Sequence, residues 1–158
     1  MNKFYYKDGS ISSEYYDSRI KILHRKDGPA VERANGHKEW WLHGRPHRED
    51  GPAVEYADGH REWYLNGMRH RKDGPAIEYT SGYKYWYVDD KLHREDGPAV
   101  EGVDGHREWY IDDGRLFILT KKHLIRYMKA NNLTIAHLLT DSDEIVRVSV
   151  AKYDWSVK

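Results

Sequence analysis

Residues 47–65 read His-Arg-Glu-Asp-Gly-Pro-Ala-Val-Glu-Tyr-Ala-Asp-Gly-His-Arg-Glu-Trp-Tyr-Leu, and this pattern occurs four times in the chain. Its fixed points are the Gly-Pro steps and the tryptophans, at Gly28, Gly51, Gly74 and Gly97 and at Trp40, Trp63, Trp86 and Trp109. Both series advance by 23 residues without a slip. A fixed period indicates a repeat protein, in which each unit buries its apolar side chains against its neighbours. A residue present in every unit is most simply explained by the fold, so a site is expected where one unit departs from the others.

Each unit predicts one β-hairpin. In the second unit the expected strands are Pro52–Tyr56 and Arg61–Leu65, and the intervening Ala57–Gly59 is a tight-turn signal. A longer polar turn, Asn66–Gly74, is expected to lead into the next unit. Because neighbouring strands lie about 4.8 Å apart, equivalent residues should recur every ~10 Å. The predicted fold is mainly β: an elongated, curved antiparallel β-meander of 23-residue hairpin repeats with a small α-helical C-terminal cap.

Three segments are expected along the chain. Residues 1–22 are interpreted as a degenerate N-terminal capping repeat, because terminal repeats are usually atypical. Residues 23–114 hold the four hairpin repeats. Residues 115–158 form a helical C-terminal appendage, and we expect it to seal the open edge of the last hairpin, since an unpaired strand edge invites aggregation.

Helix signals appear once the repeats stop. Thr120 is a candidate N-cap for a helix over Lys121–Ala130, and a short second helix is expected over Leu133–Leu139. A third is predicted over Asp143–Lys152. The basic side chains of the first helix are interpreted as solubilising, with nucleic-acid contact as the less favoured alternative.

Composition excludes several function classes. Lys plus Arg equals Asp plus Glu, so attraction to nucleic acid or to an acidic membrane is not indicated. Cysteine is absent, which rules out disulfides and Cys-based zinc sites. The sequence contains no phosphate-binding glycine loop and no nucleophile–base motif, so neither a cofactor nor catalysis is expected. Without a signal peptide or a run of about 18 apolar residues, the chain is expected to be cytoplasmic, in a host cell if it is viral.

A His-Arg-x-Asp segment opens each repeat, and its residues are His24, Arg25 and Asp27; His47, Arg48 and Asp50; His70, Arg71 and Asp73; and His93, Arg94 and Asp96. Histidine and aspartate can bind metals. Equivalent residues ~10 Å apart, however, are too distant to share one ion. We therefore interpret the segment as structural, with Asp before Gly-Pro shaping the turn.

The third unit departs from the others on one strand face. The tryptophans share strand parity with an aliphatic column and should form the core face. On the opposite parity, His60 and Glu62 of unit two correspond to Tyr83 and Tyr85 in unit three. The candidate partner-binding residues are Tyr83, Tyr85 and Tyr87, with Tyr64, Tyr110 and Tyr79 beside them. Tyrosine is enriched at protein interfaces, but cover by the C-terminal helices or simple local packing are alternatives.

The repeat resembles the MORN repeat. Residues 63–70, Trp-Tyr-Leu-Asn-Gly-Met-Arg-His, and residues 79–82, Tyr-Thr-Ser-Gly, fit the MORN pattern. Arg71 stands where a MORN unit has glycine, and it continues into Lys-Asp-Gly-Pro. The chain is therefore more similar to the variant repeat His-Arg-x-Asp-Gly-Pro-Ala of bacteriophage and giant-virus proteins. Separately, residues 138–151 look like the second helix of a HEAT-type repeat.

This resemblance implies a non-enzymatic protein-binding repeat protein, encoded by a phage or virus. MORN arrays serve mainly as interaction surfaces, so the expected partner is a host protein, such as a defence component that the chain would inhibit. The alternative is a protein that sequesters a small ligand or nucleotide by stacking it on Tyr83, Tyr85 and Tyr87. Oligomerisation stays open at this point.

Overall fold

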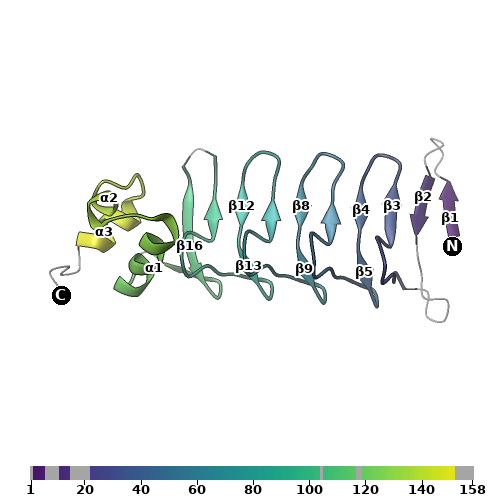
Figure 1. Cartoon of the computed structure of the whole chain (residues 1–158), viewed down its shortest axis with the longest axis horizontal. Helices are drawn as coiled ribbons and strands as arrows, with labels where there is room; N and C mark the ends of the chain where they lie inside the picture. Colours follow the sequence, from purple (N-terminus) through teal and green to yellow (C-terminus); the bar gives the residue numbers. More distant parts are fainter. Residues whose placement is uncertain (1, 6–10, 15–21, 104, 117–118, 152–158) are drawn as a thin grey trace.

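The computed structural model is an elongated, mainly β protein with three helices at its C-terminal end (Figure 1), and it describes residues 2–5, 11–14, 22–103, 105–116 and 119–151. A large antiparallel sheet runs through the repeats in the order β1-β2-β3-β4-β7-β8-β11-β12-β15-β16-β17. Three small two-stranded sheets, β5–β6, β9–β10 and β13–β14, lie beside it. The predicted meander of hairpin repeats with a helical end is confirmed.

The strands are short, and their bounds are β1 Asn2–Tyr5, β2 Ile11–Glu14, β3 Val31–Arg33, β4 Lys38–Glu39, β5 Trp41–Leu42, β6 Arg45–Pro46, β7 Val54–Glu55, β8 Arg61–Glu62, β9 Tyr64–Leu65, β10 Met68–Arg69, β11 Ile77–Glu78, β12 Lys84–Tyr85, β13 Tyr87–Val88, β14 Lys91–Leu92, β15 Val100–Glu101, β16 Arg107–Ile111 and β17 Gly114–Leu116. The hairpin of β1 and β2 pairs with β3, so the described part of the N-terminal segment extends the large sheet.

Each of the first three units contains two hairpins rather than the single one predicted. In unit two, β7 pairs with β8, and β9 pairs with β10. The predicted strand Arg61–Leu65 is interrupted at Trp63, because the Trp63 N–H donates to the Ala76 carbonyl of the next unit at 2.8 Å. The predicted polar turn is also wrong in part, since it contains β10. Asn66 and Gly67, both at positive φ (53° and 90°), close this second hairpin, as the two central residues of a type I′ turn require.

The strand register defines two faces of the large sheet. Residues directly opposite each other share a face, and Ile77 lies opposite both Glu62 and Tyr85. The tyrosine face therefore carries the buried Val/Ile column together with the glutamates and tyrosines. The tryptophan face carries the fully buried alanines and the tryptophans, and it also carries alternating charges, with Arg61 between Glu55 and Glu78.

The tryptophans are not the buried core that the sequence pattern predicted. Trp40, Trp63 and Trp86 are half-buried, and only Trp109 is fully enclosed. The repeat core is instead made of small side chains on both faces, namely Ala30, Ala53, Ala76 and Ala99 on one and Val31, Val54, Ile77 and Val100 on the other. The half-buried tryptophans are covered by arginines of the inter-unit loops rather than by a second sheet.

An arginine clamp covers each half-buried tryptophan. The Arg71 guanidinium lies 4.0 Å from the Trp63 ring centre, donates to the Pro75 carbonyl at 3.1 Å and pairs with Glu78 at 3.0 Å. A Cβ on Gly74 would approach the guanidinium carbon to 2.8 Å. Units on either side repeat the arrangement, with Arg48 over Trp40 and Arg94 over Trp86. The clamp explains why Arg, Gly and Trp recur together, since cation–π contact and charge-assisted bonds need this close approach.

The histidine of each inter-unit segment lies against the turn of the following small hairpin. His47 Nδ1 accepts the Asn66 backbone N–H at 3.0 Å, and His70 Nδ1 lies 2.8 Å from Asp89 Oδ1. These contacts fit the structural interpretation. Across the described part of the chain, no group of three or more His, Cys, Asp or Glu residues could hold a metal ion.

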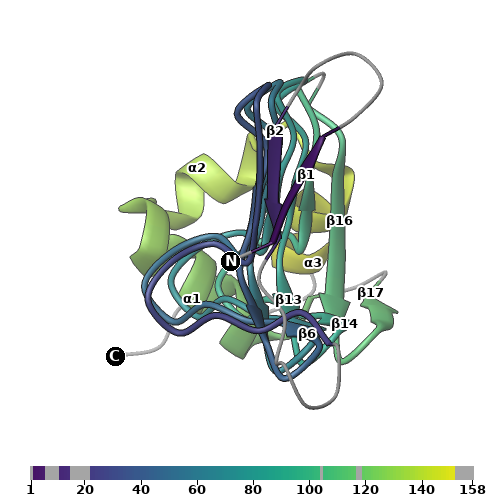
Figure 2. The ribbon, with the colours of Figure 1, turned by 90° about the vertical axis from the view of Figure 1, so that its right-hand side faces the viewer.

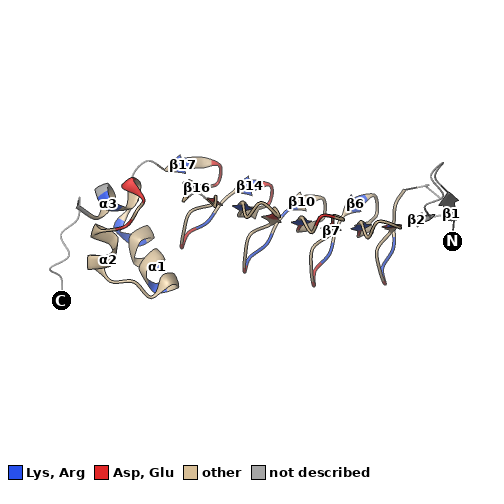
Figure 3. Ribbon diagram, turned by 90° about the horizontal axis from the view of Figure 1, so that it is seen from above, with Lys and Arg blue, Asp and Glu red and all other residues tan. Residues whose placement is uncertain are grey.

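The loops and the small hairpins project from opposite sides of the large sheet (Figures 2 and 3). The loops, which carry the His-Arg-x-Asp segments, lie over the tryptophan face, because their arginines cover the tryptophans. Helices α1 and α2 lie on the same side (Figure 2). The tyrosine face therefore lies on the side of the small hairpins.

Three helices follow the last repeat, and they are α1 Lys121–Asn131, α2 Ile135–Leu139 and α3 Glu144–Ala151. The Thr120 hydroxyl accepts the His123 N–H as predicted for an N-cap, and Asn132 ends α1 in the left-handed conformation. No described helix is long and apolar enough to cross a membrane.

The helices close the end of the array over Trp109. This ring is 1% exposed and meets the Tyr127 ring edge-on at 5.2 Å, within a cluster that includes Leu124, Leu138 and Val146. The position 23 residues after Arg94 is Phe117, so the sequence offers no further clamp arginine. The last tryptophan is instead contacted by the ring of Tyr127.

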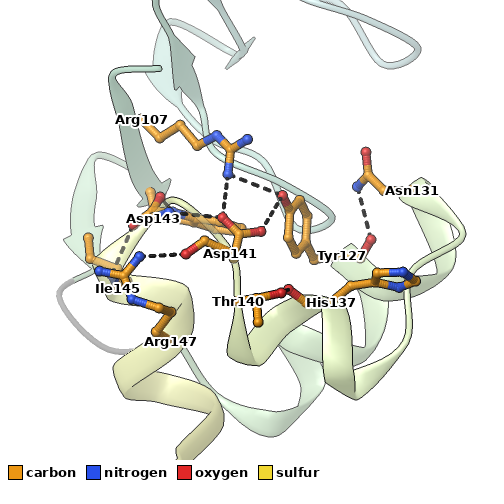
Figure 4. A network of polar contacts seen from close by, with 10 residues as sticks. Arg107, Tyr127, Asn131, His137, Thr140, Asp141, Asp143, Ile145 and Arg147 are labelled. Carbon is orange, nitrogen blue, oxygen red and sulfur yellow. Dashed lines mark hydrogen bonds and ion pairs between the residues drawn. The ribbon is translucent and has the colours of Figure 1, made fainter. Parts of the chain in front are cut away.

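Polar contacts fix this cap in place (Figure 4). Asp141 accepts a bond from Arg107 of the last repeat at 2.8 Å, and the Tyr127 hydroxyl lies 3.3 Å from the same carboxylate. Asp143 accepts the Trp109 indole N–H at 3.0 Å and the Ile145 backbone N–H at 2.9 Å. One carboxylate thus begins α3 and holds the last tryptophan.

Candidate functional site

The predicted site residues of unit three lie together on the tyrosine face. Tyr79 and Tyr83 flank the turn between β11 and β12, with the Tyr79 N–H donating to the Tyr83 carbonyl at 2.9 Å. The Tyr79 and Tyr85 rings meet edge-on, with centres 5.8 Å apart. Tyr79 is 41% exposed, and Tyr83, Tyr85 and Tyr87 are half-buried.

Aromatic rings continue from this cluster toward the N-terminal end. The His60 ring stacks on Tyr79 at 4.2 Å and on Tyr56 at 4.5 Å, and Tyr56 meets His37 at 5.1 Å. This aromatic ladder, formed by His37, Tyr56, His60, Tyr79 and Tyr85, crosses three units. Sequence reasoning missed Tyr56 as a site residue, although it lies 23 residues before Tyr79.

A glutamate is held between neighbouring side chains in the other units. Glu62 accepts the Tyr64 hydroxyl at 2.8 Å, with His60 Nε2 at 3.2 Å. Glu108 likewise accepts the Tyr110 hydroxyl at 3.0 Å. The predicted flanking residues Tyr64 and Tyr110 are therefore engaged within their own units and do not join the cluster of unit three by a ring contact in the described part of the chain.

Unit three has no such carboxylate, because Tyr85 replaces the glutamate. Within the described residues, the hydroxyls of Tyr83, Tyr85 and Tyr87 have no hydrogen-bond partner. The Tyr87 ring is partly covered, with the Arg69 guanidinium 4.0 Å from its centre. Tyr79, Tyr83 and Tyr85 are therefore the members of the cluster that are best placed to meet a partner.

Tyr85 and Tyr64 stay protonated at neutral pH. Burial raises the pKa of Tyr85, and its neighbours Tyr79 and Tyr83 add to the shift. Burial also raises the pKa of Tyr64, with the hydrogen bond to Glu62 as the second cause. These side chains can donate hydrogen bonds and offer ring surface, but they are not poised to act as bases or nucleophiles.

The described helices do not cover the candidate site. Their polar and ring contacts with the repeats involve Arg107, Trp109 and Glu95. Arg107 and Trp109 belong to the tryptophan face, and Glu95 belongs to the last inter-unit loop. Cover by the helices, one of the alternatives raised by the sequence, is therefore not what α1 to α3 do.

No protein-family model, curated protein or solved structure matches this chain. The interpretation of the site consequently rests on its own geometry and on the repeat pattern.

Proposed function

We propose that this protein is a non-enzymatic repeat scaffold that binds a partner protein through the tyrosine face of unit three. The observation that supports this most strongly is the change of His and Glu to Tyr83 and Tyr85 in one unit only. The arginine clamp is the same in unit three as in its neighbours. The tyrosines are therefore not required by the repeat fold, and tyrosine is a frequent hot-spot residue.

The resemblance to viral repeat proteins supports a more specific form of this proposal. The chain would be encoded by a phage or virus and would bind, and thereby inhibit, a host protein such as a defence component. A flat surface built on a stiff row of hairpins suits that role, because little conformational entropy is lost on binding.

Sequestration of a nucleotide is the weaker proposal. Phosphate recognition needs a cation close to the stacking rings. The guanidinium that lies over Tyr87, that of Arg69, is already paired with Asp90 at 2.7 Å. The same face also carries Glu39 and Glu62, which would repel phosphate.

The test replaces Tyr83 by His and Tyr85 by Glu, which restores the residues of the sister units. The double variant should fold as the wild type does by circular dichroism. Proteins recovered by the wild-type chain from lysate of its natural host cell should be lost with the double variant, and affinity for the purified partner should weaken by about 2 kcal/mol or more per hot spot.

Lys84→Gln is the matched control, since Lys84 lies on the same strand but on the opposite face. It should leave partner binding unchanged. Equal affinity of the wild type and the folded double variant in calorimetry would exclude unit three as the binding site.

A further inference from the structure

A hollow on the tyrosine face lies between units one and two, away from the cluster of unit three. The rings of Trp41, Tyr56 and Tyr64 line it, together with the carboxyl-bearing side chains of Glu39 and Glu62. Aromatic rings beside carboxylates form the kind of surface that attracts an organic cation, because the ring faces and the carboxylates are both negative.

Within the described residues, neither carboxylate has a buried lysine or arginine beside it, and each lies against the ring of a histidine. Glu62 is 13% exposed, and its neighbours are the Tyr64 hydroxyl and His60. Glu39 is 16% exposed, accepts the Trp41 indole N–H at 2.7 Å and lies 2.7 Å from His37 Nε2, while Arg33 reaches it at 3.8 Å from an exposed position. The carboxylates are therefore contacted by an indole N–H, a phenol O–H and imidazole rings, with Arg33 at the exposed side of Glu39, and a partially desolvated anion of this kind gains from an added positive charge.

The carboxylates of the hollow also affect the pKa of Tyr56, one of the rings that line it. Burial raises the pKa of Tyr56, and the charges of Glu62 and Glu39 raise it further. Asp58 lies at the rim and adds to the same shift. The carboxylates of Glu62, Glu39 and Asp58 thus all act on the Tyr56 ring that lines the hollow.

We propose that this hollow binds a cationic side chain, a guanidinium or an ammonium group, of the partner protein. The cation would lie among Trp41, Tyr56 and Tyr64 and beside Glu39 and Glu62. This inference rests on the proposed function and adds the chemistry of the partner. The segment of the partner protein that contacts this chain carries Arg or Lys opposite units one and two, and it presents an uncharged surface to Tyr83 and Tyr85.

The glutamate position of this hollow differs in units three and four. Unit three lacks the carboxylate, since Tyr85 stands in its place. In unit four Glu108 already holds the Arg115 guanidinium at 3.0 Å. In the hollow between units one and two, Arg33 lies 3.8 Å from Glu39 and is 44% exposed, and Glu62 has no arginine partner in the described part of the chain.

The experiment uses the full chain and the tripeptide acetyl-Gly-Arg-Gly-amide as probe. In ¹H–¹⁵N NMR titrations, the Trp41 indole signal should shift saturably with the arginine tripeptide. The same peptide with citrulline, which has the shape of arginine without the charge, should leave it unmoved. Glu62→Gln should weaken the arginine affinity by about tenfold, the effect of losing a charge-assisted contact.

Glu108→Gln is the control variant, because it removes the same residue type from a unit whose carboxylate already has a cation, and it should leave the affinity unchanged. Glu39→Gln should reproduce the loss if Glu62→Gln proves poorly folded. Equal shifts with arginine and citrulline, or an unchanged affinity in both folded Gln variants, would overturn the proposal.

The experiments distinguish a failure of the cation site from a failure of the proposed protein-binding function. If the tripeptide does not bind, yet Tyr83 and Tyr85 remain essential for partner recovery, the cation site is wrong and the protein-binding role stands. If the tripeptide binds at Trp41 while the unit-three variant keeps its partner, the cation site stands and the tyrosine cluster is not the interface.

Discussion

A single arginine in each inter-unit loop links three parts of the structure. Arg71 contacts the Trp63 ring of the preceding unit, the Pro75 carbonyl of its own loop and the Glu78 carboxylate of the next strand. Lysine could supply the charge but not the flat, forked donor set. The glycine at position 74 is needed for a steric reason, since the three atoms nearest to an added Cβ all belong to Arg71.

A double-mutant cycle tests this steric link. Gly74→Ala should destabilise the wild-type chain by about 1–3 kcal/mol, because the new methyl group overpacks the clamp. In an Arg71→Ala background the same change should cost much less, since the obstructing guanidinium is gone. Urea unfolding of the four proteins measures the coupling. An equal cost of Gly74→Ala in both backgrounds would show that the glycine is required for backbone reasons instead.

At the scale of elements, the small hairpins form a second row beside the large sheet. The Gly67 N–H donates to the Pro46 carbonyl at 2.9 Å, and the Asp90 N–H donates to the Arg69 carbonyl at 3.0 Å, so neighbouring small hairpins are bonded across units. Asp90 strengthens the second of these links, because its carboxylate accepts from both the backbone and the side chain of Arg69.

Stability should therefore depend on the ionisation of Asp90. Burial alone would raise the pKa of Asp90, but the hydrogen bonds and charge of Arg69 outweigh it and lower the pKa. A lowered pKa in the folded state means that the stabilisation is fully present above the ordinary value of about 4 and is lost as pH falls through the lowered value. Asp90→Asn should thus reduce the loss of stability between neutral and acid pH, measured by urea unfolding.

Asp113→Asn is the comparison for this experiment. Asp113 occupies the equivalent turn position in unit four, but it accepts the Leu92 backbone N–H where Asp90 accepts from an arginine. If both variants change the acid sensitivity equally, the Arg69 pair is not its source.

Elements could be predicted from the sequence more reliably than their contacts. The 23-residue period predicts the hairpin array, and Thr120 predicts the start of α1, because both signals are local. The break at Trp63 could not be predicted, since it follows from a hydrogen bond to Ala76 in the next unit. In α1 the helical spacing places Leu124, Ile125 and Met128 on one face, and of these Leu124 is buried whereas Ile125 is 38% exposed. The spacing does not identify Tyr127, whose burial depends on docking against Trp109.

In the candidate site, too, the local sequence signals were predictable and the contacts between units were not. Tyr83 and Tyr85 were found because they break the repeat. The aromatic ladder was missed, because alternation within one strand does not reveal which rings of the neighbouring strand lie opposite. Tyr56 became part of the surface only once the register placed it against His60.

At the scale of the whole molecule, the two ends of the array differ. At the C-terminal end, the cap buries Trp109 beneath Tyr127 and anchors itself through Arg107 and Asp141. At the other end, the described part shows the hairpin of β1 and β2 continuing the sheet. Because the described part of the cap supplies most of the apolar cluster around Trp109, we expect the array to depend on it.

Truncation after Leu116 tests that dependence. Removing the helices would expose Trp109 and the apolar side chains around it, and large exposed apolar patches favour association. The truncated chain should aggregate or form larger oligomers in light scattering coupled to size-exclusion chromatography. A monodisperse, folded product would show instead that the helical segment is an independent module.

The clamps also have a direction along the chain. Trp40 is covered by Arg48, Trp63 by Arg71 and Trp86 by Arg94, so each ring is covered by a residue that comes later in the sequence. During synthesis, a hairpin that has just left the ribosome would keep its indole uncovered until the following loop emerges. Folding would proceed from the N-terminal end one unit at a time, and at each stage only the tryptophan of the most recently folded unit would be uncovered. The emergence of Tyr127 from the ribosome would complete the folding of the array.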